Sequence, residues 1–231
     1  MGHTPHMYVP TPWDGPDLAV GEEARHHLEK VLRRSDGEIS YTDGAGCVGI
    51  GTYAAGRIAR GRESDVARPM PWLTLAVAAP TSTNRARMVV EKLAEVGVDR
   101  LLWLETAWSR GRPPRSSRTM SWAVAALEQS QGAWLLEVAG SIALADAVAD
   151  GRGVVVADPS GDPIDATLDY SSGGRLTVVV GPEGGFAPEE VPAGVPRLSL
   201  GGRILRLETA AIVASGIVAA QRHHRGGATK D

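Results

Sequence analysis

The chain has 231 residues, a length that suits one medium domain or a small domain joined to a larger one. Apolar residues make up 43% of it, enough for a substantial core, and no apolar run approaches the roughly 18 residues of a membrane-spanning helix. The single cysteine excludes an internal disulfide, and with scattered histidines the sequence offers no zinc site. Because the N-terminus also lacks an apolar signal core, we expect a cytoplasmic protein without a metal or a membrane segment.

The formal net charge of −3 argues mildly against a nucleic-acid partner, but the charge is unevenly distributed. Residues 71–130 carry 8 basic and 5 acidic groups, so the middle of the chain is net positive. Nucleic-acid binding depends on a local basic face rather than on the total charge. The composition therefore leaves RNA or DNA open as a partner.

Residues 1–69 read as a small β-rich module with one short helix. The helix is expected over residues 22–34, where His27, Lys30 and Arg34 lie three and four apart and share a face. This face either contacts a nucleic acid or is solvated. Residues 38–43 alternate like a strand, and the Asp43-Gly44 pair predicts a hairpin turn.

The hairpin contains a formal GxGxxG pattern at residues 44–49. A dinucleotide site needs a helix after this pattern and an acidic residue about 20 positions further on. A strand is expected over residues 50–58 instead, and the acidic residue is missing. We therefore interpret the pattern as unrelated to dinucleotide binding.

Prolines at residues 69 and 71 mark a linker, and residues 70–231 then alternate between strand and helix patterns. Such alternation predicts a mostly parallel α/β sheet. The expected strands cover residues 73–79, 100–104, 134–138, 153–157, 176–180 and 197–200. The expected helices cover residues 84–96, 117–131 and 144–149, and a last helix begins near residue 208.

Four arginines fall within nine residues around a Pro-Pro pair that no helix could span. They are Arg110, Arg112, Arg115 and Arg118. A basic loop beside a ligand crevice is where RNA phosphates would be expected to bind. The alternative is a solvated loop without a ligand.

Two glycine-rich loops leave the ends of two apolar strands near the C-terminus. Residues 181–186 read GPEGGF, and residues 201–206 read GGRILR. Ligands of open α/β sheets bind in the crevice at the carboxyl ends of the strands, where glycine lets the backbone approach a flat ligand. A phosphate-binding GxxxxGK[ST] loop is absent, and no lysine lies between Lys92 and Lys230.

At these residues the chain resembles a known family. GPEGGF followed by LGGRILRLETA resembles the paired signature of the RsmE family, the ribosomal RNA small subunit methyltransferase E enzymes of the SPOUT class. The segment HHLEKVLR resembles the N-terminal signature of that family, EKLAEVGV its K-A-x-E-L-G-V segment, and residues 128–130 its E-Q-S triplet. The resemblance extends over nearly the whole chain and is most specific between residues 178 and 211.

The resemblance implies an α/β fold in which a C-terminal SPOUT-type trefoil-knot methyltransferase domain, residues 70–231, follows a PUA-like β-barrel RNA-binding domain, residues 1–69. It implies S-adenosylmethionine as cofactor and methyl transfer to N3 of a uridine in 16S ribosomal RNA. It also implies a homodimer whose substrate is small-subunit RNA or the assembled small ribosomal subunit.

The same resemblance suggests a set of site residues. Cofactor contacts are expected from Asp158, Pro159, Val180, Gly181, Pro182, Glu183, Gly184, Gly185, Leu200, Gly201, Ile204, Leu205, Thr209 and Ala210. RNA contacts are expected from His27, Lys30, Arg33, Arg34, Arg110, Arg112, Arg115 and Arg118.

Catalysis is expected to involve Arg203, Arg206 and Glu183. Removal of the N3 proton builds negative charge on the uracil oxygens, which a guanidinium can stabilise. The two arginines could instead form ion pairs to Glu183 or Glu208 that shape the loops. Glu183 could act as a general base or could accept hydrogen bonds that hold its turn.

The chain departs from the family pattern at Trp108, at residues 131–135, at Gly202 and at Leu207. The family has an arginine after the strand end at which this chain reads TAWSR, residues 106–110, and an arginine and a proline after its E-Q-S triplet. These departures motivate a second reading, a non-catalytic RNA-binding relative. A third reading is a SPOUT enzyme that acts on another RNA, and an unrelated nucleotide-binding α/β enzyme is least favoured because the phosphate and dinucleotide motifs are missing.

Overall fold

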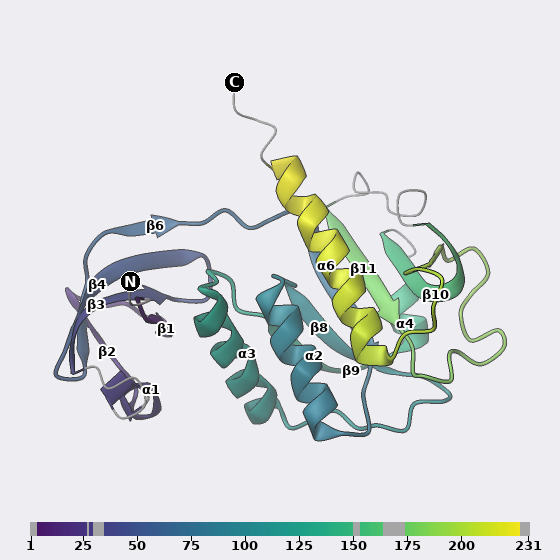
Figure 1. The fold of residues 1–231 in the computed structure, drawn as a ribbon, viewed down its shortest axis with the longest axis horizontal. Coiled ribbons are helices and arrows are strands. Elements are labelled where there is room, and N and C mark those ends of the chain that lie inside the picture. The colour runs from purple at the N-terminus through teal and green to yellow at the C-terminus, as the bar shows by residue number, and fades with distance from the viewer. Residues whose placement is uncertain (1–3, 27, 30–34, 150–152, 164–173, 227–231) are drawn as a thin grey trace. The chain divides into compact units, whose positions relative to one another are not determined.

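The computed structural model describes residues 4–26, 28–29, 35–149, 153–163 and 174–226 (Figure 1). Its chain forms two compact units. One comprises Met1–Arg68 and Val124–Leu135, the other Pro69–Ala123 and Leu136–Asp231. The predicted RNA contacts His27, Lys30, Arg33 and Arg34 lie outside the described residues.

The first unit is built on one mixed β-sheet, as the sequence predicts for this region. Its elements are β1 (His6–Tyr8), β2 (Asp17–Ala19), α1 (Glu22–His26), β3 (Asp36–Thr42), β4 (Cys47–Ala54), β5 (Arg57–Ala59) and β6 (Glu63–Asp65). The strand order is β1-β3-β4-β5-β2, and β6 pairs with β4. The predicted hairpin joins β3 to β4, where Thr42 pairs with Val48.

The GxGxxG pattern has a packing role in this hairpin. A Cβ at Gly49 would lie 2.3 Å from the Tyr41 ring, and a Cβ at Gly46 would lie 2.4 Å from the Trp134 ring. Both positions need glycine because aromatic rings occupy the space of a side chain. Burial, together with a 2.7 Å hydrogen bond to Glu63, raises the pKa of Tyr41 to about 12.

The segment Val124–Leu135, which the sequence pattern assigned to the second domain, belongs to the first unit. It contains the end of α3 (Ser116–Ser130). The Glu128 carboxylate accepts the Tyr8 N–H at 3.0 Å, and the Leu135 N–H donates to the Gly44 carbonyl at 2.8 Å. Glu128 of the E-Q-S triplet is therefore a structural anchor in this chain.

The strand expected over residues 134–138 is wrong at its start. Trp134 forms only an isolated bridge with Ala45, and the strand β9 (Glu137–Ala143) begins later. The Trp134 ring lies over Gly46, and the Arg68 guanidinium stacks on it at 3.9 Å. This packing holds the segment against the hairpin rather than in the second sheet.

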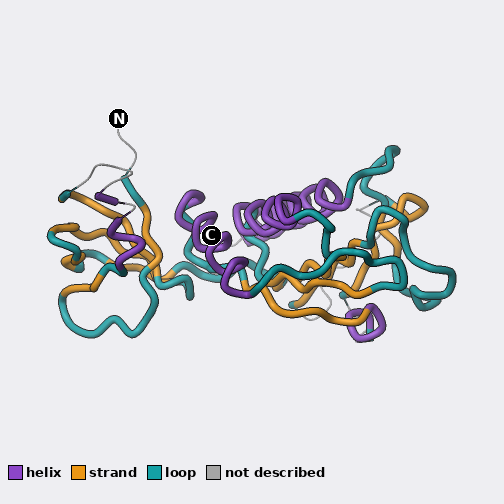
Figure 2. Tube along the Cα trace, turned by 90° about the horizontal axis from the view of Figure 1, so that it is seen from below, coloured by secondary structure: helices purple, strands orange, loops and turns teal. Residues whose placement is uncertain are grey.

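The second unit contains the expected parallel sheet. Its further elements are β7 (Trp72–Ala78), α2 (Thr83–Glu95), β8 (Arg100–Glu105), α4 (Leu144–Val148), β10 (Val154–Asp162), β11 (Arg175–Val180), β12 (Arg197–Leu198) and α6 (Leu207–Gly226). The strand order is β12-β10-β11-β7-β8-β9, and every pair is parallel. The helices α2 and α6 lie on one face of this sheet, and the short α4 lies on the other (Figure 2).

The core of this unit follows the apolar runs of its strands. β7 and β11 are central in the sheet, and Leu75, Val178 and Val179 are fully buried. Strands covered on both faces need continuous apolar sequence, which residues 73–79 and 176–180 supply. On α2, Val89 and Leu93 stand four residues apart and are fully buried, while Val96 on the same face is half-buried.

A buried ion pair joins α6 to the start of the sheet. The Arg222 Nη1 atom lies 2.6 Å from the Asp99 Oδ2 atom, and the two side chains are 1% and 3% exposed. The same Arg222 nitrogen donates to the Pro71 carbonyl at 2.9 Å, and the Asp99 carboxylate accepts the Leu73 N–H at 2.7 Å. This pair therefore connects the last turns of α6 to the start of β7 and to the turn before β8.

No helix in the part of the chain that the structure describes is both long and apolar enough to cross a membrane.

Candidate active site

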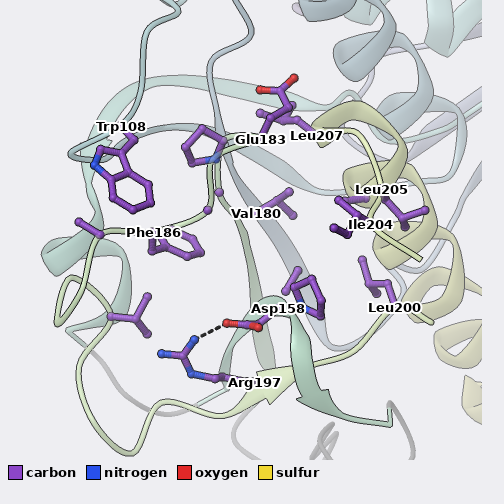
Figure 3. Close-up of a pocket in the computed structure, with 18 of the residues that line it drawn as sticks. Trp108, Asp158, Val180, Glu183, Phe186, Arg197, Leu200, Ile204, Leu205 and Leu207 are labelled. Atoms are coloured by element: carbon purple, nitrogen blue, oxygen red, sulfur yellow. Dashed lines mark hydrogen bonds and ion pairs between the residues drawn. The ribbon is translucent and has the colours of Figure 1, made fainter. Parts of the chain in front are cut away.

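A cavity of about 500 Å³ opens at the carboxyl ends of β10, β11 and β12 (Figure 3). Its wall consists of the two glycine-rich loops, the end of β10, the start of α6, and Trp108 from the loop after β8. The lining residues are Trp108, Ala157, Asp158, Pro159, Val180, Gly181, Pro182, Glu183, Gly185, Phe186, Ala187, Pro188, Glu189, Val191, Arg197, Leu200, Gly201, Arg203, Ile204, Leu205, Leu207 and Ala210.

The GPEGGF loop follows β11 and turns back on itself. The Gly185 N–H donates to the Pro182 carbonyl at 2.8 Å, and Gly185 has a φ of 76°, which favours glycine. The Phe186 ring packs against Gly181, where a Cβ would lie 2.8 Å from it. The motif thus places a tight turn and an aromatic ring together on the cavity wall.

The end of β10 supplies a carboxylate to the opposite wall. The pairing of β10 with β12 shifts register between Ala157 and Asp162, so Asp158 and Pro159 lie in an irregular part of a strand that continues beyond the expected residues 153–157. Arg197 donates to the Asp158 carboxylate, which also accepts the Ser160 N–H at 2.8 Å. Burial would raise the pKa of Asp158, but the Ser160 and Arg197 hydrogen bonds outweigh it and lower that pKa.

An ion-pair network around Arg85 connects three elements beside the cavity. From α2, the Arg85 guanidinium contacts Glu183 of the GPEGGF loop and Glu208 of α6, the latter at 2.5 Å and 2.9 Å. The hydrogen bond from Arg85 is the main cause of the lowered pKa of Glu183. Burial opposes the shift at Glu208, but Arg85 still keeps its pKa below the usual range.

Arg85 makes the direct contacts to both carboxylates, while the charge of Arg206 still helps to lower the pKa of Glu208. Within the described residues, neither arginine forms an ion pair to Glu183 or Glu208, and both side chains are exposed. Arg203 lines the cavity, while Arg206 lies just before α6 and does not line it. Because Glu183 is held ionised by Arg85 with a lowered pKa, it suits a structural role better than that of a strong base.

The loop after β8 is fixed to the loop after β11 by one carboxylate. Glu190 accepts the Ala107 N–H at 2.6 Å and the Ala187 N–H at 2.8 Å. A turn between Thr106 and Ser109, closed by a 3.1 Å backbone hydrogen bond, then carries Trp108 to the cavity rim. Figure 3 shows the indole ring next to Phe186.

The structure brings the residues predicted for the cofactor together around this cavity, except for Gly184 and Thr209, which are exposed outside its wall. Sequence reasoning missed several of its lining residues. Phe186 stands inside the quoted motif, and Arg197 begins a predicted strand, so both had a signal. Trp108 had none, because β8 is separated from β11 in the sheet by β7.

A second cavity, of about 480 Å³, lies at the carboxyl end of β7. Its lining includes Thr81 and Thr83 together with Arg112, Arg115 and Arg118 from the predicted basic loop. Arg110 is exposed in the same loop but does not line the cavity. A Cβ at Gly111 would lie 1.9 Å from the Ala79 carbonyl oxygen, so the loop runs directly against the end of β7.

The three arginines of the second cavity form no ion pair with any residue that the structure describes. Their charge is therefore uncompensated by protein carboxylates there. Across the same described ranges, no group of three or more histidine, cysteine, aspartate or glutamate side chains could hold a metal ion.

Comparison with known proteins points to one family. A family model described as an RNA methyltransferase domain matches residues 68–219. The ribosomal RNA small subunit methyltransferase E of Mycobacterium tuberculosis (strain CDC 1551 / Oshkosh) is 31% identical over an alignment that covers 92% of this chain and 90% of that protein.

Solved structures share the fold over nearly the full length. A probable rRNA-methyltransferase from Porphyromonas gingivalis has a TM-score of 0.81 and 25% identity, and covers 96% of this chain and 99% of its own. A ribosomal RNA small subunit methyltransferase E from Neisseria gonorrhoeae, bound to S-adenosyl methionine, has a TM-score of 0.82 and 22% identity, with coverage of 95% and 98%. The predicted α/β fold is thereby confirmed, and both solved structures that share it are named as methyltransferases. The chain belongs to the ribosomal RNA small subunit methyltransferase E family, the family that its paired glycine-rich motifs resemble.

Proposed function

We propose that this protein transfers a methyl group from S-adenosylmethionine to N3 of a specific uridine in the 16S ribosomal RNA of the small subunit. The observation that carries the proposal is the single cavity in which both family motifs meet, with Arg203 exposed on its wall. Family membership supports the reaction class. Because the chain departs from the family pattern at Trp108 and at residues 131–135, the target nucleotide is to be determined by experiment.

The cavity suits an adenosyl sulfonium ligand. Its lining includes the glycines Gly181 and Gly185, and its apolar surface includes Leu200 and Ile204, the latter 87% exposed and free to pack on a ligand. Among the described carboxylates that line the cavity, Asp158 is paired with Arg197 and Glu183 with Arg85, so Glu189 is the one that remains to favour a cation. Bound there, S-adenosylmethionine supplies a methyl group on a positively charged sulfur, which is already activated for transfer.

The protein must then align the uracil ring and stabilise its charge. Alignment of donor and acceptor accounts for most of the acceleration of such a reaction. The proton on N3 would pass to solvent water, and the resulting negative charge on the uracil oxygens would be stabilised by an exposed guanidinium, for which Arg203 and Arg206 are available. Glu183 is assigned to holding the loop through Arg85 rather than to taking the proton.

The RNA is proposed to bind the basic cavity of Arg112, Arg115 and Arg118, with Arg110 beside it, and the first unit is proposed to be a PUA-like RNA-binding module. The further family features are proposed on the resemblance alone. They are a trefoil knot in the second unit, a homodimeric assembly, and action in the cytoplasm on small-subunit RNA or the assembled small subunit.

The test combines purified protein, labelled S-adenosylmethionine and small ribosomal subunits that lack their native methylation. Reverse transcription then maps the product, because a methyl group on N3 blocks the base-pairing edge and stops the polymerase. A new stop at one uridine is the expected result. Cofactor binding without transfer would indicate another RNA substrate or a non-catalytic RNA-binding protein, and no cofactor binding at all would exclude the proposed enzyme.

The arginines of the second glycine-rich loop are expected to act on the transfer step. Arg203→Ala and Arg206→Ala should each reduce kcat by roughly 100- to 1,000-fold, the usual loss of one charge-stabilising donor, while the Kd for S-adenosylmethionine changes only a few-fold. Single-turnover kinetics and calorimetry measure the two quantities. Arg175→Ala, at the opposite end of β11, is the matched control and should change neither. If the affinity for S-adenosylmethionine fell by as large a factor as kcat, these arginines would belong to the cofactor pocket instead.

The basic cavity is expected to make the salt dependence of RNA binding steeper. Replacing Arg112, Arg115 and Arg118 with Gln should reduce the slope of log K against log salt by about 0.7 for each phosphate that is no longer neutralised. Binding to a single-stranded 16S fragment, measured across a salt series, gives the slope. Arg87→Gln removes an exposed arginine that is already paired with Glu91, so its slope should equal that of the wild type. An unchanged slope in the triple variant would mean that this cavity binds no phosphate.

A further inference from the structure

The loop between β8 and α3 contributes to both cavities of the second unit. Trp108 lies on the rim of the first cavity, and Arg112 and Arg115 line the second. The loop is held at two points, by the Glu190 carboxylate at Ala107 and by the close approach of Gly111 to the end of β7. The aromatic ring and the two guanidinium groups are therefore presented from one anchored backbone.

Trp108 is a large aromatic residue that remains exposed at the cavity rim. Its side chain is 46% exposed, although large aromatic rings usually gain stability by burial. A Cβ at Gly184 would lie 3.5 Å from the ring, at ordinary van der Waals distance, so the glycine loop lies close to one edge of the ring while nearly half of the residue stays exposed. An exposed, fixed ring at a cavity rim is available to stack on a flat ligand.

We propose that Trp108 is the stacking platform for the RNA base that enters the first cavity, and so a positioning residue for the acceptor. The inference rests on the proposed function. RNA-binding proteins recognise splayed-out bases by stacking them on aromatic side chains, while arginines hold the adjoining phosphates. An RNA strand that lies along the β8–α3 loop would place one base on the Trp108 ring and its neighbouring phosphates on the arginines of the loop.

The position of Trp108 separates this role from cofactor binding. The cofactor wall is built from β10, β11, β12 and α6, whereas Trp108 comes from the loop after β8, two strands away from β11 in the sheet. The guanidinium groups on the same loop bind phosphate, which RNA carries and S-adenosylmethionine lacks. Trp108 therefore lies on the part of the rim whose loop also carries the arginines proposed to bind RNA.

The test uses the full chain as wild type, Trp108→Phe and Trp108→Leu. Phenylalanine keeps a π-face, while leucine keeps apolar area without one. The probes are a short oligoribonucleotide with one central uridine and the same oligonucleotide with an abasic site at that position. Stacking contributes roughly 1–3 kcal/mol per base, so the wild type should bind the uridine probe about 5- to 150-fold more tightly than the abasic probe.

Trp108→Phe should keep most of this preference, and Trp108→Leu should lose it. The Kd for S-adenosylmethionine should stay within about twofold in all three proteins, and the KM for small subunits should rise in Trp108→Leu by the same factor as the lost preference. Thermal unfolding at an unchanged midpoint shows that both variants fold.

Three results overturn the inference. A preference for uridine that survives in Trp108→Leu would show that the ring does not stack on the base. A loss of cofactor affinity as large as the loss of RNA affinity would assign Trp108 to the cofactor site instead. A wild type that binds both probes equally would show that no base is stacked. Failure of the proposed function is a separate result, seen as cofactor binding by the wild type without methyl transfer to small subunits.

Discussion

Replacing Asp99 with Asn is expected to lower the free energy of unfolding by about 3–5 kcal/mol, the usual cost of leaving one member of a buried ion pair without its partner. The amide keeps an oxygen for the Leu73 N–H, so the loss reflects the Arg222 guanidinium, which is 1% exposed and would be left uncompensated. Equilibrium urea unfolding, followed by circular dichroism, measures the change.

Two further variants define this effect. Arg87→Met removes a surface pair with Glu91 and should change stability by less than about 1 kcal/mol. Combining Asp99→Asn with Arg222→Met removes both charges, so the double variant should be more stable than Asp99→Asn alone. If Asp99→Asn costs no more than the surface control, the pair does not hold α6 to the sheet.

Replacing Arg85 with Met should impair both stability and methyl transfer. Glu208 is only 8% exposed and would lose its charged hydrogen-bond partner, at a cost of about 1.5–3 kcal/mol. The GPEGGF loop would also lose its connection to α2 and α6, and displacement of a reacting group by about 1 Å can reduce the rate about 100-fold. Urea unfolding and single-turnover methyl transfer measure the two effects.

Arg85→Lys is the matched control, because it keeps the charge but not the planar fork that reaches two carboxylates at once. Compared with Arg85→Met, Arg85→Lys should recover part of the lost stability and a smaller part of the lost methyl-transfer activity. Methyl transfer at the wild-type rate in Arg85→Met would show that the network does not position the loop.

The acid dependence of stability should report the same network. Glu183 and Glu208 have pKa values below those of the unfolded chain, which are near 4.3. The unfolded chain therefore binds protons first as the pH falls, so the stabilisation is complete above that value and is lost as the pH drops through the folded pKa values. In Arg85→Met, the decline of stability as the pH falls below about 4.3 should be shallower. An identical decline would mean that other carboxylates cause it.

Local patterns in the sequence were sufficient for most of the second unit. The continuous apolar runs at residues 73–79 and 176–180 predict parallel strands that are buried on both faces. The helical spacing of Val89 and Leu93 predicts the buried face of α2. The two glycine-rich loops predict a ligand cavity at the strand ends, and the family signature they carry identifies the family.

Other features depend on contacts between residues far apart in the chain. The final glycine of the GxGxxG pattern is explained by the Tyr41 ring, and the late start of β9 by the packing of Trp134 over Gly46. These aromatic contacts join residues that no periodic pattern relates. The glycine pattern therefore had no role in the sequence analysis, and the strand was expected to begin three residues too early.

The sequence by itself determined the α/β class, the order of the strands and helices along the chain, and the two motifs of the cavity, because these depend on local periodicity and backbone preference. Only the tertiary structure decided that Arg85, rather than Arg203 or Arg206, pairs with Glu183 and Glu208, and that Trp108 reaches the same cavity from β8. Ion pairs and cavity walls form between side chains whose distance is set by sheet order, which no local pattern records.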